Sequence, residues 1–390
     1  MNRYISADYI YPIHELPIKK GVIEVTPQGE IIQLHRSQAN IDTNSIEYYD
    51  GIIVPGFVNA HCHLELSHLK GEIETHTGLT TFLKKVIKRP LERKEIIEAK
   101  MKAADAEMER NGIVAVGDIA NTPMSKEVKQ TSKLYYHTFV EILGFEPHAA
   151  QEAFEKGLDL CKQFAPLSVS LTPHAPYSVC KDLFRLIQNL CIKQTNPLSI
   201  HNQESEAENK FFRYKEGPFI DFYKSLERNI DFFKAQARNS IQTISPLLPQ
   251  NEQILLVHNT FTSYKDINFT DRYGLDVTWC FCPNANLYIE DQLPQIQHFY
   301  KSNEKIVLGT DSLASNHGLS ILEEIKTIQS HYKQIPLHEL LKWGTLNGAE
   351  FFGIAETYGS IEPGKKPGLN LIEQVSNGQV HSDAVVRKLF

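Results

Sequence analysis

Two histidines, His61 and His63, follow an apolar run at residues 52–60 and are separated by a single cysteine. If that run is a buried strand, alternate side chains point to opposite faces, so both imidazoles share one face and Cys62 points away. Two imidazoles on one face can bind a transition metal, and nitrogen ligands suit zinc or iron. The pair alone is equally compatible with two histidines at the entrance of a loop.

Apolar runs recur along the chain with helical patterns between them. There are eight such runs, at residues 52–60, 112–119, 136–143, 167–172, 198–200, 254–257, 276–282 and 305–308. Stretches with helical spacing, such as 94–110 and 180–193, separate most of them. Alternation of strands and helices indicates an α/β fold with a parallel sheet, and eight units can close into a (β/α)8 TIM-type barrel.

Three further acid or imidazole residues follow these runs in the way that the histidine pair does: His201, His258 and Asp311. In a barrel of this type the C-terminal strand ends face one another across the catalytic mouth. The five side chains should therefore converge, which is the argument for a metal site.

The composition is that of an ordinary soluble enzyme. Of the 390 residues 42% are hydrophobic, which suits one barrel with a minor domain better than three equal domains. The net charge of −7 comes from 40 basic and 47 acidic residues without a basic block, so nucleic acid is not an expected partner. We expect no signal peptide and no membrane association, because no apolar run is long enough to cross a bilayer. Six cysteines without the spacing of a small secreted domain predict reduced thiols and a cytoplasmic location.

Both ends of the chain carry short strand patterns. Residues 22–25 and 31–34 have the pattern of a hairpin, and residues 369–372 follow a turn-rich stretch at 358–365. Neither end has enough strands for an independent sheet. We therefore expect a small β-sandwich domain built from both termini, with the chain divided into residues 1–54, 55–355 and 356–390.

Several motifs, in order along essentially the whole chain, resemble those of the amidohydrolase superfamily. These are Pro55-Gly56-Phe57-Val58-Asn59-Ala60-His61-Cys62-His63, His201-x-x-Glu204, Val257-His258, Cys282-Pro283-x-x-Asn286 and Leu308-Gly309-Thr310-Asp311. More narrowly, they resemble the cytosine deaminase and S-adenosylhomocysteine deaminase branch. The resemblance implies one divalent metal ion, usually zinc with iron as the alternative, held by His61, His63, His201 and Asp311. It also implies that Glu204 and His258 are the acid–base residues of a hydrolytic deaminase.

The chemistry gives independent reasons for these roles. Three neutral histidines and one carboxylate leave an open position for water, whose pKa on a metal falls to about 7. A carboxyl group three residues past a ligand, Glu204, can protonate a ring nitrogen and then the departing amine. His258 would orient and deprotonate the water, and Asp311 could both bind the metal and accept a proton. Glu204 could instead be a solvated loop acid, since Glu206 and Glu208 follow it.

One absence favours a single metal. Two-metal relatives usually bridge their ions with a carbamylated lysine at the end of the fourth strand, where this chain reads Thr172-Pro173-His174. We therefore favour a one-metal deaminase over a dihydroorotase-like hydrolase. The unrelated cytidine deaminase site needs a Pro-Cys-x-x-Cys motif, which the sequence lacks.

The substrate prediction depends on short local matches. His174 matches a substrate-contacting histidine in relatives that deaminate adenosyl compounds, and residues 63–67 with 82–87 resemble aminodeoxyfutalosine deaminases. We expect Glu65, His174 and Arg213 to bind the substrate, although Glu65 could instead fix its loop and Arg213 could be a surface residue.

The expected substrate is a small molecule, a 6-aminopurine nucleoside with an extended 5′-substituent. We place 6-amino-6-deoxyfutalosine first, followed by methylthioadenosine or S-adenosylhomocysteine. The alternatives are an amidohydrolase that acts on a cyclic amide, a guanine- or cytosine-like base or a halogenated ring, and a catalytically silent metal-binding barrel. For the oligomeric state we keep a homodimer open.

Overall fold

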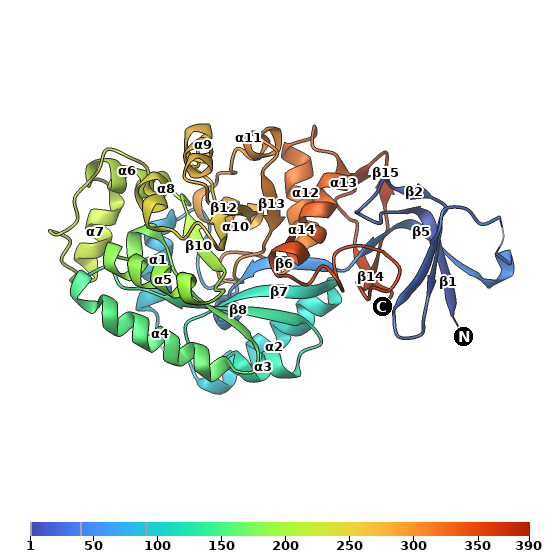
Figure 1. Ribbon diagram of the computed structural model, residues 1–390, viewed down its shortest axis with the longest axis horizontal. Helices are drawn as coiled ribbons and strands as arrows, with labels where there is room; N and C mark the ends of the chain where they lie inside the picture. Colours follow the sequence, from blue (N-terminus) through green and yellow to red (C-terminus); the bar gives the residue numbers. More distant parts are fainter. Residues whose placement is uncertain (1, 40, 91) are drawn as a thin grey trace.

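The computed structural model describes residues 2–39, 41–90 and 92–390, and a ring of parallel strands forms its centre (Figure 1). These strands pair in chain order as two four-stranded sheets: β6 (Phe57–Cys62), β7 (Ile113–Ala120), β8 (Tyr135–Ile142) and β9 (Ser168–Pro173), then β10 (Leu198–Asn202), β11 (Gln253–His258), β12 (Asp276–Phe281) and β13 (Lys305–Leu308). They correspond to the eight predicted runs, and the arrangement is that of a TIM-type barrel.

The two four-stranded sheets meet at both edges through hydrogen bonds at their C-terminal ends. At the edge between β13 and β6, the carbonyl of His61 accepts from the backbone N–H groups of Thr310 and Asp311, at 3.1 and 3.0 Å. At the edge between β9 and β10, the backbone N–H of His201 donates to the carbonyl of His174 at 2.9 Å. At both junctions between the two sheets, which we call the seams, the hydrogen bonds therefore involve residues that the sequence assigned to the active site.

Helices connect the strands and surround the ring (Figure 1). They are α1 (Leu79–Lys88), α2 (Lys94–Arg110), α3 (Lys126–Thr131), α4 (Ala150–Phe164), α5 (Lys181–Lys193), α6 (Glu206–Tyr214), α7 (Pro218–Ser225), α8 (Ser240–Ile244), α9 (Tyr264–Arg272), α10 (Pro283–Glu290), α11 (Ile296–Lys301), α12 (Ile321–His331), α13 (Leu337–Trp343) and α14 (Leu346–Phe351). The two helices predicted from spacing, at 94–110 and 180–193, are α2 and α5. On α5, Leu183, Ile187 and Cys191 recur every four residues and are buried, as an amphipathic helix on a barrel requires.

Strands from both ends of the chain pair in one sheet beside the barrel, where both termini lie (Figure 1). Its members are β1 (Arg3–Ile10), β2 (Ile18–Lys19), β3 (Val22–Val25), β4 (Ile31–His35), β5 (Ile46–Pro55), β14 (Leu369–Ile372) and β17 (Val386–Lys388). β5 pairs in parallel with β1 and antiparallel with β14, so it joins the two ends. The short strands β15 (Val375–Ser376) and β16 (Gln379–Val380) form a separate pair. The pairing of the two ends agrees with the prediction, while the sandwich form and the domain limits remain predictions.

The structure corrects the interpretation of residues 52–60 as one strand. Ile46–Pro55 is β5 of the terminal sheet, and Phe57–Cys62 is β6 of the barrel. Gly56 lies between them in a crowded position, because an added Cβ would come 2.3 Å from Val114 Cγ1 and 2.7 Å from the carbonyl oxygen of Pro367. A glycine lets the chain pass from one sheet to the other without a break in the apolar pattern, so periodicity alone did not reveal the boundary.

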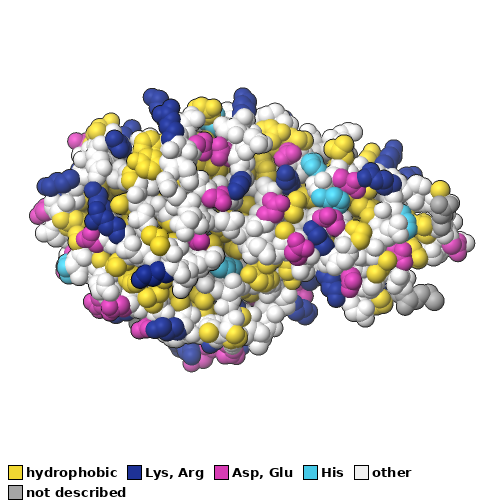
Figure 2. All heavy atoms as spheres, viewed as in Figure 1, with side chains coloured by type: hydrophobic (Ala, Val, Ile, Leu, Met, Phe, Trp, Pro, Cys, Tyr) yellow, Lys and Arg dark blue, Asp and Glu magenta, His cyan; other side chains and the backbone are white. Residues whose placement is uncertain are grey.

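All six cysteines are free, and most of them are buried. None of the six forms a disulfide, and Cys280 and Cys282 are buried in a cluster with Leu255, Val257 and Val307. Among the described residues, no helix combines the length and apolar character that crossing a bilayer requires. On the visible face Lys and Arg side chains alternate with Asp and Glu (Figure 2).

The contact between Gly309 and His61, the first candidate metal ligand, can be tested by mutation. An added Cβ at Gly309 would lie 2.8 Å from His61 Cβ and 3.0 Å from the His61 backbone nitrogen. We expect Gly309→Ala to displace His61 and to lower the metal content of the purified protein, measured by elemental analysis. The control is Gly274→Ala, where φ is +67° and no atom lies within 4 Å, so only backbone strain of about 1–2 kcal/mol is added. Normal metal content in Gly309→Ala would show that this contact does not position His61.

Candidate metal centre and active site

Four nitrogen and oxygen atoms from three barrel strands meet at the C-terminal mouth. His63 Nε2 lies 3.1 Å from His61 Nε2, 3.2 Å from His201 Nε2 and 3.3 Å from Asp311 Oδ1. His61 Nε2 and Asp311 Oδ1 are 3.6 Å apart. All four side chains are buried. The sequence predicted this convergence from strand ends alone.

The spacing of these atoms fits a single shared cation. Ligand atoms at about 2.0–2.1 Å from one zinc ion in a tetrahedral shell lie about 3.3 Å from each other. The observed separations of 3.1–3.6 Å have this size. Uncharged nitrogens held this close without a cation would place their lone pairs against one another, so the donor set suits a divalent metal.

Neighbouring groups orient two of the four atoms. The Nδ1–H of His201 donates to the carbonyl of His174 at 3.0 Å, which leaves Nε2 as the free lone pair. Ser315 Oγ donates to Asp311 Oδ2 and so turns Oδ1 toward the histidines. Asp311 itself has a left-handed φ of +55°. Such backbone is strained for a residue other than glycine, and strain of this kind clusters at functional sites.

A buried ion pair fixes the chain directly after His63. Asp118 Oδ1 accepts from the backbone N–H of Leu64 at 2.7 Å, and its Oδ2 lies 2.6 Å from Lys129 Nζ. Lys129 Nζ also donates to Thr138 Oγ1 at 3.0 Å. Since neither charged group of the pair is exposed, each depends on the other to remain charged inside the protein. The pair therefore stabilises the turn that carries His63.

His258 lies beside the metal ligands with one ring nitrogen fixed by an amide. Its Nδ1 lies 3.2 Å from Asn286 Oδ1, an acceptor, so Nδ1 carries the proton and Nε2 has the lone pair. Nε2 is 3.6 Å from Glu204 Oε1. Burial lowers the pKa of His258, although the charge of Asp311 and the bond to Asn286 oppose this. The ring is therefore neutral and can accept a proton.

Glu204 is a buried carboxyl group rather than a solvated loop acid. Glu204 is only 4% exposed. Burial raises the pKa of its carboxyl group well above the usual range, and the charges of Asp311 and Glu290 add to the rise. Glu208 is also buried and accepts from the backbone N–H groups of Gln203 and Glu204, at 3.1 and 3.3 Å. The sequence had suggested that Glu208 belongs to a solvated stretch. Instead, its carboxylate fixes the backbone on either side of the peptide bond before Glu204.

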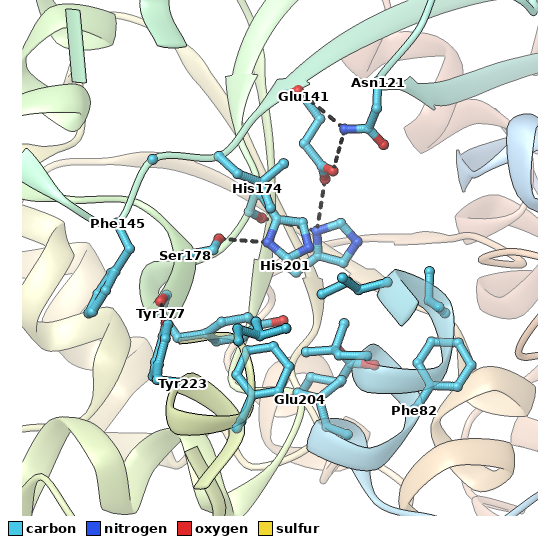
Figure 3. Close-up of a pocket in the computed structure, with 18 of the residues that line it drawn as sticks. Phe82, Asn121, Glu141, Phe145, His174, Tyr177, Ser178, His201, Glu204 and Tyr223 are labelled. Carbon is cyan, nitrogen blue, oxygen red and sulfur yellow. Dashed lines mark hydrogen bonds and ion pairs between the residues drawn. The ribbon is translucent and has the colours of Figure 1, made fainter. Parts of the chain in front are cut away.

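A cavity of about 630 Å³ opens from these residues to the surface. Figure 3 shows Glu141, His174 and His201 on one side of it and Phe82, Phe145 and Tyr223 elsewhere along its wall. The apolar wall comes mainly from helices α1 and α7 and is formed by Leu79, Phe82, Leu83, Val86, Phe222, Tyr223 and Leu226. Lys88 Nζ donates to the carbonyl of Ser225 at 2.7 Å and ties these helices together. The cavity therefore joins a polar end to an apolar one.

The three predicted substrate-binding residues lie in different places. His174 lines the cavity, with Nδ1 bonded to Ser178 Oγ at 2.6 Å, so Nε2 remains for a ligand. Burial lowers its pKa to about 3, which keeps the ring neutral.

Glu65 and Arg213 lie outside the residues that line the cavity. Glu65 accepts from the backbone N–H of Asn121 at 3.2 Å and from Thr122 Oγ1 at 2.9 Å, so it fixes the loop after β7. Arg213 lies on α6, where it pairs with Glu206. The geometry gives neither side chain direct access to a ligand in this cavity.

Sequence reasoning missed two charged residues that line the cavity, Glu141 and Arg228. Glu141 lies inside the apolar run predicted at 136–143, near the end of β8, so a search for residues that follow each run does not find it. Arg228 pairs with Glu146 at 2.9 Å near the surface, and no sequence pattern marks it.

Three comparisons place the chain among known proteins. The model of the amidohydrolase family matches residues 52–387. An adenosine deaminase of Helicobacter pylori is 26% identical over 330 residues, which cover 83% of this chain and 79% of the relative. A 5-methylthioadenosine/S-adenosylhomocysteine deaminase of Pyrococcus abyssi is 23% identical over 354 residues, which cover 85% of this chain and 76% of the relative.

Among solved structures, the aminofutalosine deaminase of Helicobacter pylori in complex with methylthio-coformycin superposes with a TM-score of 0.81. The identity is 21%, and the match covers 99% of this chain and 98% of that one. At this identity the likeness supports the fold, a TIM-type barrel.

The geometry of the four ligand atoms yields a test by metal analysis. We expect one equivalent of divalent metal per chain, because the atoms fit one coordination shell. His61→Ala and Asp311→Ala should each lose the metal, since three ligands hold an ion less tightly than four. His76→Ala, which removes an exposed histidine beside Asp291, should retain it. Two equivalents in the native protein, or full metal content in His61→Ala, would contradict this assignment.

Proposed function

This chain belongs to the amidohydrolase family of metal-dependent hydrolases that act on carbon–nitrogen bonds, and we propose that it deaminates a 6-aminopurine nucleoside. The observation that carries the proposal is the pairing of Glu204 with His258 beside the metal ligands. Glu204 is a proton-bearing carboxyl and His258 a neutral base, and their polar atoms lie 3.6 Å apart. Addition of water to an N=C–NH2 unit needs such an acid and such a base at one carbon atom.

The proton inventory of the reaction can be assigned to these residues. A divalent metal held by His61, His63, His201 and Asp311 would supply Lewis-acid activation of water. His258 Nε2 orients the attacking water and removes a proton from it, and this proton passes by way of Asp311 to the departing amine. Glu204 gives its proton to the ring nitrogen and recovers one from the new hydroxyl group as ammonia leaves. The substrate gains one water and loses one ammonia, and all three side chains return to their starting states.

The donor set favours one zinc ion. Three imidazoles and one carboxylate could hold zinc together with a water molecule, and iron accepts the same ligands. At the end of β9, where a bridging lysine would stand, Thr172 Oγ1 donates to the carbonyl of Ser199 at 2.6 Å. This packing supports a single-metal site.

The apolar end of the cavity supports a nucleoside with an extended 5′-substituent. A free base would occupy only the polar end, near His174 and Glu204, and would leave the α1 and α7 side chains without contact. A methylthio or aryl group could bury against Phe82 and Phe222, and apolar burial contributes about 25 cal/mol per Å². Methylthioadenosine carries a methylthio group and 6-amino-6-deoxyfutalosine an aryl group, whereas the 5′-thioether of S-adenosylhomocysteine ends in a charged amino acid. The named deaminases among the relatives support the same class.

The free thiols of the six cysteines support a reducing compartment, and with it the predicted cytoplasmic location.

Removal of the acid should separate turnover from metal binding. Glu204→Gln should retain one equivalent of metal, because Glu204 is not a ligand, yet lose turnover by about 10²–10⁴-fold. His258→Asn should behave in the same way. Glu206→Gln is a matched control, since Glu206 is two residues away and pairs with Arg213. The assay is ammonia release, with metal content measured on each variant. A near-normal rate in Glu204→Gln would refute the proposed mechanism.

A substrate panel tests the nucleoside class. We expect kcat/KM to be highest for aminodeoxyfutalosine, then for methylthioadenosine or S-adenosylhomocysteine, then adenosine, with cytosine and guanine far lower. Phe82→Ala should lower kcat/KM about tenfold or more for the 5′-substituted substrates relative to adenosine, because their apolar group loses its contact. Phe269→Ala, which truncates a ring on α9 outside the cavity, is the control. Dominance of cytosine or guanine would overturn the nucleoside class.

A further inference from the structure

Glu141 is a buried carboxyl group of the cavity that the proposed proton transfers do not use. It stands near the end of β8, is 7% exposed and lines the cavity. Its Oε2 accepts from Asn121 Nδ2 at 2.9 Å, whereas Oε1 has no hydrogen-bond partner among the described residues. A buried carboxylate oxygen without a donor is costly, so its presence at the cavity wall points to a donor on the ligand.

The side chain is held in one orientation by a short chain of contacts. Asn121 Nδ2 donates to both the carboxylate and the backbone carbonyl of Glu141, at 2.9 and 3.2 Å. The backbone N–H of Asn121 donates to Glu65 at 3.2 Å. Glu65 therefore does not line the cavity but acts as a positioning residue for Asn121. Because Oε2 is fixed in this way, the direction of Oε1 is fixed too.

The adjacent histidine does not satisfy Oε1. His201 Nδ1 lies 3.5 Å from it, but this nitrogen has one proton, which it donates to the carbonyl of His174 at 3.0 Å. The same bond argues against a second cation between Glu141, His174 and His201, whose polar atoms lie within 4.8 Å of each other. A metal there would need a bare Nδ1. The donor that matches Oε1 must therefore come from outside the protein.

We propose that Glu141 is a specificity-determining residue that accepts a hydrogen bond from a sugar hydroxyl of the nucleoside. This inference rests on the proposed function. A 6-aminopurine ring offers acceptor nitrogens and one amino group, and that amino group is the leaving group of the reaction. In adenosine and methylthioadenosine the sugar hydroxyls are the remaining donors. In Figure 3, Glu141 and Glu204 lie on opposite sides of the His174 and His201 rings. A substrate with its ring nitrogen at Glu204 can therefore extend a different group toward Glu141.

The test compares adenosine with 2′-deoxyadenosine and 3′-deoxyadenosine in the metal-loaded enzyme. The native protein should prefer adenosine over at least one deoxy analogue by about tenfold in kcat/KM, because loss of the donor leaves the buried Oε1 without a partner. In Glu141→Ala and Glu141→Gln this preference should shrink toward unity, chiefly through loss of activity on adenosine. Glu304→Gln alters a carboxyl that binds Trp279 outside the cavity and should keep the native preference.

Metal content and hydroxyl preference together separate the outcomes. Retained metal with a lost preference in both Glu141 variants supports the proposal. Lost metal with an unchanged residual preference would overturn it, because Glu141 would then act by positioning His201. An equal rate on all three nucleosides in the native enzyme would overturn it while leaving the proposed function intact. If the native enzyme releases ammonia from no nucleoside, the proposed function fails and this inference fails with it.

Discussion

The barrel closes through the backbone of the residues proposed to bind the metal, and the proposed active site depends on this closure. The carbonyl of His61 accepts from Thr310 and Asp311 at one seam. The carbonyl of His174 accepts from both the backbone and the ring of His201 at the other. Because parallel strands bond to their neighbours all around a barrel, a shift at either seam moves a ligand. The fold and the coordination geometry are therefore fixed by the same hydrogen bonds.

Strained backbone accompanies this closure. Gln203, His258 and Asp311 have φ values of +44°, +74° and +55°, and each lies at the end of a strand or within three residues after it. Such conformations cost about 1–3 kcal/mol each for residues other than glycine. They turn His258 and Asp311 out of the strand direction and into the mouth. The buried hydrogen bonds of Asn286 to His258 and of Ser315 to Asp311 hold both side chains in this arrangement.

Low exposure decides the protonation of the catalytic pair. In water at neutral pH a carboxyl group is largely charged and an imidazole is partly protonated. Burial favours the neutral form of both groups. Glu204 thereby keeps the proton that the ring nitrogen needs, and His258 keeps the lone pair that the water needs.

The sequence predicted the barrel and the converging residues because both follow from local rules. Apolar runs locate strands, and the parallel topology then brings His61, His201 and Asp311 to one end. The sequence pattern did not separate β5 from β6, because the apolar pattern of residues 52–60 continues across Gly56. Glu65 and Arg213 were expected at the substrate, but the direction of a side chain depends on its tertiary contacts, and theirs are with Thr122 and Glu206. The homodimer and the domain limits remain predictions.

The central claim is that one metal ion held at this mouth drives deamination of a nucleoside. The most direct measurement removes the metal with a chelator and adds zinc back in steps. Ammonia release from methylthioadenosine is measured after each addition. The account predicts that activity rises linearly and reaches its plateau at one equivalent per chain. A plateau at two equivalents, or full activity in the metal-free protein, would contradict it.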